Sequence, residues 1–307
     1  MRISTSTIYQ QGAARISDLQ SSLVKTQQQL STGRRILTPA DDPVAAARAL
    51  DVTQSQSVNA QYATNRQTAV SSLTAVEGSL TSVTSLLQDV RTLVISAGNG
   101  ALSDADRGYI AASIRGRFDD LLALANASDG AGNYLFSGYQ TAAPPFNKTS
   151  VTTGGVTVTG AQYVGDQGQR MLQVDSSRQL AISASGQAIF QPAGKDIFKT
   201  LNDLATLLET PGTTNLASGL STANGDITQA LDNVLKVRAS VGSRLKELDS
   251  LDSAGSSRDI QYSQTLSWLQ DVDYAKAISQ LSQQQTTLQA AQQSFVKIAG
   301  LSLFNYL

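Results

Sequence analysis

Histidine and cysteine are both missing from this chain of 307 residues. Without histidine, the protein lacks the commonest general base and the commonest metal-binding side chain. Without cysteine, it has no thiol nucleophile, no disulfide and no thiolate metal site. Enzymes that depend on these side chains are therefore excluded, and a chain that travels unfolded would not cross-link on the way.

Charged and aromatic residues are scarce, at 15% and 6% of the chain. Both fractions are low for a globular protein, and the composition favours long, thin helical assemblies over a bulky core. The formal net charge is -1, so no basic field predicts nucleic acid or an anionic membrane as a partner.

Long apolar runs are missing as well. No stretch approaches the roughly 20 apolar residues of a membrane span, and residues 1–12 carry no apolar segment of signal-peptide length. We therefore expect no membrane insertion, and an export route without a cleaved signal peptide if the protein leaves the cell.

Both ends of the chain carry narrow apolar stripes at helical spacing. Steps of three, four and seven residues predict an amphipathic helix at each end. The N-terminal stripe is Ile16, Leu19, Leu23 and Leu30, and the C-terminal stripe is Ile278, Leu281, Leu288 and Phe295. Such narrow stripes bury against one or two partner helices, so the two terminal helices are expected to pair.

The clearest periodicity predicts a long helix from Pro43 to about Gly98. Its apolar residues alternate three and four steps from Leu73 to Val94. Asp42 is placed to cap the free N–H groups, and proline fits the first helical position. About 55 residues at 1.5 Å each make a rod on the order of 80 Å long, a length typical of filaments and coiled coils.

Further helices flank a segment of different amino-acid composition. Ser103 and Asp106 form a capping-box pattern that opens a helix ending near Asp129. Residues 134–190 are rich in Gly, Thr and Val with period-two alternation, which predicts a small inserted β domain.

Three more helical segments are expected after this insert. They are a short helix over residues 196–209, a long helix over 216–250, and a terminal helix after a break at residues 253–255. The predicted fold is mainly α with an inserted small β domain, a long antiparallel helical rod and paired terminal helices. The expected regions are 1–42 and 256–307 (terminal assembly helices), 43–133 and 193–255 (rod), and 134–192 (outer β domain).

Six motifs, long and ordered, carry a family resemblance. They are residues 1–5 (MRIST), 29–36 (QLSTGRRI), 39–47 (PADDPVAAA), 133–138 (NYLFSG), 271–278 (DVDYAKAI) and 301–307 (LSLFNYL). With these motifs the chain resembles the bacterial flagellin superfamily, and most closely its members that join the hook to the filament. The resemblance spans nearly the whole chain and is weakest over residues 147–190.

This resemblance implies a structural role in the flagellum, with no enzymatic activity and no cofactor. It implies terminal helices that pack into the axial core of a tube and a variable β domain that faces outward. The implied partners are the first hook-associated protein on the hook side, flagellin on the filament side, copies of the same chain in a ring or helical layer, and a cytoplasmic export chaperone. The implied location is extracellular, at the hook–filament junction, reached unfolded through the flagellar type III channel.

The expected assembly interface consists of both stripes and five further residues. These five are Arg34, Arg35, Leu301, Phe304 and Tyr306. Either a solvated loop or an acidic partner surface would explain the two arginines. The aromatic residues at the C-terminus are favoured as assembly contacts, because terminal residues without a partner normally fray.

Three acidic patterns have competing interpretations. Asp41 and Asp42 could be an acid/base pair, but helix capping is the simpler reading. Asp271 with Asp273 supplies two oxygen ligands, far short of a calcium cage. Residues 165–168 (GDQG) could be a ligand loop, although a turn explains them more simply. We therefore predict no catalytic, cofactor or metal site.

Two other functions remain open. A flagellin-type filament subunit would share the same fold. A secreted adhesin on a helical stalk would use the insert at residues 147–190 for binding.

Overall fold

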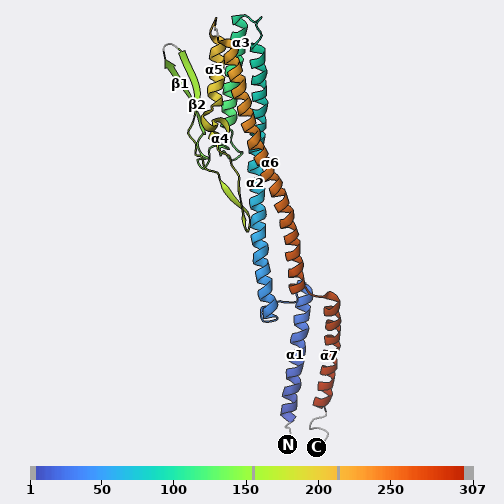
Figure 1. Ribbon diagram of the computed structural model, residues 1–307. Coiled ribbons are helices and arrows are strands. Elements are labelled where there is room, and N and C mark those ends of the chain that lie inside the picture. Colours follow the sequence, from blue (N-terminus) through green and yellow to red (C-terminus); the bar gives the residue numbers. More distant parts are fainter. Residues whose placement is uncertain (1–4, 154–155, 213–214, 301–307) are drawn as a thin grey trace, which may run out of the picture. The chain divides into compact units, whose positions relative to one another are not determined.

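The computed structural model describes residues 5–153, 156–212 and 215–300, and it is mainly helical (Figure 1). The helices are α1 (Thr5–Thr32), α2 (Pro43–Ala97), α3 (Asp104–Ala125), α4 (Gly186–Phe190), α5 (Ile197–Glu209), α6 (Leu216–Gln270) and α7 (Tyr274–Gly300). A 3-10 turn, η1 (Pro192–Gly194), follows α4. The strands are β1 (Phe146–Thr153), β2 (Val156–Tyr163), β3 (Met171–Asp175) and β4 (Arg178–Ala181). The expected class, mainly α with a small β insert, is confirmed.

The chain forms two compact units. The terminal unit contains residues 1–59 and 257–307, and the central unit contains residues 60–256. Helices α2 and α6 each contribute to both. Within the terminal unit, α1 and α7 lie side by side (Figure 1), so the predicted pairing of the terminal helices is confirmed.

Local capping residues start the helices where the sequence predicts. Asp42 accepts a hydrogen bond from the Ala45 N–H at 3.0 Å and caps α2, which begins at Pro43. Ser103 and Asp106 form the complete capping box of α3. Asp196 caps α5 through the N–H groups of Phe198 and Lys199.

Helix α3 ends earlier than predicted. It stops at Ala125, because the next residue, Asn126, leaves the helix to pair with β1. The Asn126 amide donates to the carbonyl of Phe146 and accepts from its N–H, both at 2.9 Å. This exchange fixes the first residue of the β insert to the end of α3.

The core of the central unit is built on the predicted stripe of α2. All seven residues of this stripe are buried: Leu73, Val76, Leu80, Val83, Leu87, Val90 and Val94. They belong to one cluster with α3, represented by Ile114, and α6, represented by Ile227 and Val234. Five phenylalanines extend this core towards the insert through ring contacts with centroids 5.2 to 5.9 Å apart: Phe118, Phe136, Phe146, Phe190 and Phe198.

The insert contains two separate hairpins. Strands β1 and β2 pair in antiparallel register from Phe146 with Tyr163 onward, and β3 pairs with β4. Isolated hairpins are only marginally stable in water. The second hairpin is therefore held to the long helices by side chains. Arg178 forms a two-pronged pair with Glu247, and the buried Arg66 donates to the carbonyl of Val174 at 3.3 Å.

The predicted break at residues 253–255 is wrong, because α6 continues to Gln270. A single glycine costs a helix only about 1 kcal/mol, and Gly255 has a packing reason to be there. A Cβ at this position would collide with the guanidinium of Arg66. The true break falls at residues 271–273, where Asp273 caps α7 by accepting from the Lys276 N–H at 3.1 Å. Among the described helices, none is long and apolar enough to cross a membrane.

Candidate assembly surface

The terminal stripes meet between α1 and α7 but remain incompletely covered. The helices run antiparallel, with the ring of Tyr9 edge-on to Phe295 at 6.0 Å between centroids. Among the side chains described in these two helices, only Thr26 and Ala277 are buried. The N-terminal stripe and Leu281, Leu288 and Phe295 are half-buried, whereas Ile278 is 57% exposed. A pair of helices with so little buried apolar area has a strong drive to acquire further neighbours.

A short backbone bridge fixes the two connections beside this pair. We call residues 33–35 and 270–272 the clasp. The N–H of Arg35 donates to the carbonyl of Gln270 at 2.6 Å, and the N–H of Val272 donates to the carbonyl of Gly33 at 2.9 Å. Gly33 has a φ of 69°, a left-handed conformation that favours glycine. The clasp thus holds the end of α1 against the link between α6 and α7.

The two predicted arginines have different surroundings. The Arg35 guanidinium pairs with Asp42 at 3.1 Å and donates to the carbonyl of Leu269 at 2.9 Å, so it ties the start of α2 to the last turn of α6. The side chain of Arg34 is exposed, with no ion pair or hydrogen bond to the residues that the structure describes. Arg34 is therefore available to a partner, whereas Arg35 is engaged within the chain.

Adjacent carboxylates stabilise the connection between α1 and α2. Asp41 pairs with Lys25 at 2.6 Å and accepts from the N–H groups of Leu37 and Thr38. The hydrogen bond from Lys25 is the main reason why the pKa of Asp41 falls to about 2, with the Thr38 N–H next. The hydrogen bond from the Ala45 N–H, followed by that from Arg35, lowers the pKa of Asp42.

These hydrogen bonds favour capping over acid/base chemistry for the two carboxylates. An acid/base pair needs environments that push the two pKa values apart, and both of these are lowered. Asp271 accepts from the Ser267 hydroxyl at 2.6 Å, and Asp273 caps α7. In the described part of the chain, no group of three or more acidic side chains is arranged to hold a metal ion.

Exposed apolar side chains surround the same unit. Trp268, the only tryptophan of the sequence, is 86% exposed on α6, so it does not pack inside the single chain. Val44 and Leu50 on α2 and Ile260 on α6 are also exposed. Tryptophan is among the residues that dominate binding energy at protein interfaces. Trp268 can be picked out from the sequence as a candidate contact, because it is the only tryptophan in a chain with few aromatic residues.

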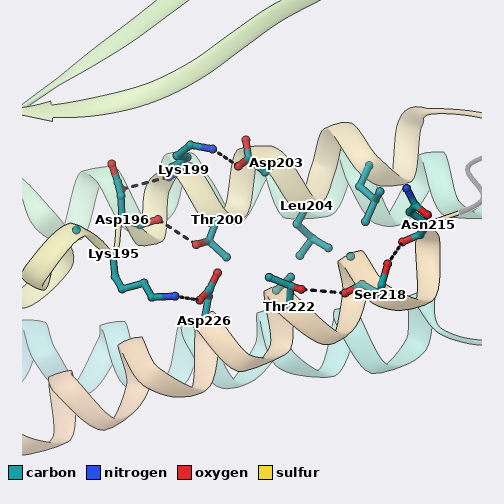
Figure 2. Close-up of a pocket in the computed structure, with 14 residues that line it drawn as sticks. Lys195, Asp196, Lys199, Thr200, Asp203, Leu204, Asn215, Ser218, Thr222 and Asp226 are labelled. Atoms are coloured by element: carbon teal, nitrogen blue, oxygen red, sulfur yellow. Dashed lines mark hydrogen bonds and ion pairs between the residues drawn. The ribbon is translucent and has the colours of Figure 1, made fainter.

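A cleft lies within the central unit. It has a volume of about 530 Å³ and lies between α5 and α6 (Figure 2). Both of its lysines form ion pairs, Lys195 with Asp226 at 2.6 Å and Lys199 with Asp203, and the remaining carboxylate, Asp196, caps α5. Because each of these charged groups is engaged within the chain, the cleft offers little to a substrate. The predicted interface residues Leu301, Phe304 and Tyr306 lie outside the described residues.

Family comparisons agree with the helical organisation. The profile for the bacterial flagellin N-terminal helical region matches residues 3–141, and the profile for the bacterial flagellin C-terminal helical region matches residues 225–307. The flagellar hook-associated protein 3 of Escherichia coli K12 and that of Salmonella typhimurium LT2 are each 38% identical to this chain, over 99% of both proteins. A Bacillus subtilis flagellin is 26% identical over 91% of this chain and 90% of its own length.

Solved structures share this fold. The structure of a flagellar hook-associated protein from Vibrio parahaemolyticus covers 75% of this chain and 99% of its own, with 26% identity and a TM-score of 0.67. The flagellar junction protein FlgL from Legionella pneumophila covers 73% of this chain and 100% of its own, with 20% identity and a TM-score of 0.60.

Proposed function

Because this chain belongs to the bacterial flagellin family, in the hook-associated protein 3 branch, we propose that it is the structural subunit that joins the hook of the flagellum to the filament. The observation that carries this proposal is the 38% identity with two hook-associated proteins over 99% of both chains. Flagellins match less well, at 26% identity over most of the chain or about 32% over only 34% of it. The match therefore favours a junction protein over a filament subunit.

The terminal unit is the proposed assembly element. Its two stripes stay half-buried, and exposed at Ile278, when α1 pairs with α7, so copies of the chain would cover the remaining apolar surface on assembly. Head-to-tail contacts between identical subunits form rings or helical tubes. We assign to this interface both stripes together with Arg34, Leu301, Phe304 and Tyr306, and also Arg35, whose side chain is engaged within the chain and would position the interface.

In this proposal the rest of the chain has a supporting role. Residues 43–133 and 193–255 form the helical rod, and residues 134–192 form an outer domain. The first hook-associated protein would bind on the hook side, flagellin on the filament side, and a cytoplasmic chaperone before export. The protein would act without enzymatic activity, outside the cell, after export through the flagellar channel without a cleaved signal peptide. The cysteine-free composition supports such a passage, because an unfolded chain without thiols cannot cross-link.

Electron microscopy of a strain that lacks the gene tests the proposal, together with a probe for flagellin in the medium. We expect bare hooks of normal appearance and free flagellin in the medium, because the filament would have nothing to attach to. If flagellin were missing from both the cell surface and the medium, the protein would be the filament subunit instead. Intact filaments with normal motility would exclude both flagellar roles.

A further inference from the structure

The insert contains a cleft with a polar, uncharged lining. The cleft has a volume of about 310 Å³ and lies between the loop at residues 167–169 and helix α4. Its lining residues are Gln167, Gln169, Ser185, Gln187, Ala188, Gln191 and Pro192. Four of the seven are glutamines and none is charged, so we call it the amide cleft. Such a lining offers hydrogen bonds without offering a countercharge.

Both walls of the amide cleft are fixed before any ligand arrives. The loop is held by the Asp166 N–H, which donates to the carbonyl of Ser137 at 3.0 Å, and by the Arg170 N–H, which donates to the Ser183 hydroxyl at 2.9 Å. Helix α4 is anchored by Ile189 and Phe190, which are buried in the core. A site that is already formed binds without the cost of ordering its walls.

The glutamines keep unused hydrogen-bonding capacity. The Gln167 amide donates to the side-chain oxygen Oε1 of Gln187 at 2.6 Å, which orients both side chains across the cleft. Each primary amide has two donors and one acceptor oxygen, so this pair retains groups for a ligand. Gln169 is exposed, and its amide makes no hydrogen bond with the described residues. Gln191 differs, because its amide is already bonded to Ala161 and Asp196.

An aromatic ring lies beside these amides. Tyr139 packs against Gly168, the residue between two of the lining glutamines, and any side chain at position 168 would overlap the ring. The tyrosine is nevertheless 62% exposed. The region therefore combines neutral donors and acceptors with an exposed flat apolar face.

We propose that the amide cleft binds a neutral oligosaccharide. Sugar hydroxyls both donate and accept hydrogen bonds, as amides do, and the C–H face of a pyranose ring can stack on Tyr139. An anionic ligand would find no positive charge in this lining. A protein partner would find few of the apolar or charged pockets that anchor interface hot spots, since Ala188 and Pro192 are the only apolar lining residues.

The location of the cleft separates this proposal from the junction role. All seven lining residues lie between the two matched flagellin regions, which cover residues 3–141 and 225–307. Apart from Tyr139, which lies at the end of the first matched region, the proposal therefore concerns the segment that is not recognised by either family profile. It does not depend on how the protein assembles.

The test uses the purified full-length chain and an array of immobilised neutral and carboxylated oligosaccharides. Saturation-transfer NMR then measures the affinity for a neutral sugar that binds. We expect the double variant Gln167→Ala/Gln187→Ala to bind about tenfold more weakly, because it removes several ligand hydrogen bonds. Tyr139→Ala should also weaken binding. Gln179→Ala, an exposed glutamine on β4 outside the cleft, is the matched control and should bind within about twofold of the wild type.

Circular dichroism melting curves establish that each variant is folded. Three results would overturn the proposal: no binding to any neutral oligosaccharide, binding only to carboxylated sugars, or equal binding by the folded double variant and the wild type. If the double variant instead changes self-association and not sugar binding, the amide cleft is a contact between copies of the chain.

Discussion

Replacement of Arg35 by alanine should loosen the terminal unit and leave the central unit intact. The guanidinium joins two parts of the chain that are far apart in sequence, Asp42 at 3.1 Å and the carbonyl of Leu269 at 2.9 Å. The clasp would keep its two backbone hydrogen bonds in the variant, but the first turn of α2 would lose its side-chain tie to the end of α6. Local opening of the clasp should therefore become more frequent.

The magnitude follows from the exposure of the groups involved. The Arg35 side chain is 46% exposed, so its ion pair with Asp42 is screened by water. An exposed ion pair contributes about 0 to 1 kcal/mol, and a hydrogen bond about 1 kcal/mol. We expect a combined loss of roughly 1 kcal/mol, which corresponds to an approximately fivefold larger opening constant.

Amide hydrogen exchange read by mass spectrometry measures this opening. Peptides that cover residues 33–42 and 270–280 should exchange about fivefold faster in Arg35→Ala. Peptides from the buried stripe of α2 in the central unit should be unchanged. Arg35→Lys should be intermediate, because a single ammonium cannot reproduce the forked contacts of a guanidinium.

Arg34→Ala is the matched control. It removes the charge next to Arg35 in the sequence, but the Arg34 side chain makes no ion pair or hydrogen bond with the described residues. It should leave hydrogen exchange unchanged. In cells, Arg34→Ala should reduce filament attachment only if Arg34 contacts a partner. Equal acceleration in both variants would show that net charge matters and the Arg35 contacts do not. Unchanged exchange in Arg35→Ala would refute the reasoning outright.

Three further predictions concern acid stability, the core and assembly. The pKa of Asp41 is lowered from 3.8 to about 2, so its contribution to stability is complete above about pH 4 and is lost as the pH falls towards 2. Carbon-13 NMR titration of this carboxyl should give the low midpoint. A midpoint near 4 would contradict the contacts with Lys25 and Thr38. Phe198→Ala should lower the free energy of unfolding in urea by about 3 to 5 kcal/mol, because the ring is fully buried against three other phenylalanines. Tyr109→Ala, at a 74% exposed residue, is the control, and an equally small loss in both variants would argue against this core. Phe295→Ala should change the stability of the monomer by about 1 kcal/mol or less, because the ring is half-buried and its edge-on contact with Tyr9 is modest. The same variant should nevertheless fail to restore filaments in the deletion strain. Normal filaments by electron microscopy would show that Phe295 is not part of the interface.

Helix starts were predictable because their signals are local. Asp42 with Pro43, Ser103 with Asp106, and Asp196 each satisfy N–H groups within three or four residues. The buried stripe of α2 was predictable for a similar reason, since a single helix face sets its period. These features need no knowledge of the rest of the chain.

Helix ends and long-range contacts were less accessible. Gly255 resembles a helix stop, but its meaning depends on Arg66, a residue almost 190 positions away, whose guanidinium occupies the space of a Cβ. The clasp likewise joins Gly33 to Val272 through backbone groups, which carry no sequence signature. Periodicity could place Trp268 on a helix but could not show that its side chain is exposed in the single chain.

The contrast between the two units suggests how one chain could be stable alone and still depend on assembly. The central unit buries a continuous apolar stripe on α2 and a phenylalanine cluster, enough to hold its helices and hairpins together. In the described parts of α1 and α7, burial is complete only for Thr26 and Ala277. A helix pair of this kind gains most of its stability from neighbours that cover its apolar surface. In the proposed assembly, much of the free energy of folding for the terminal unit would therefore be released when neighbouring subunits cover its stripes.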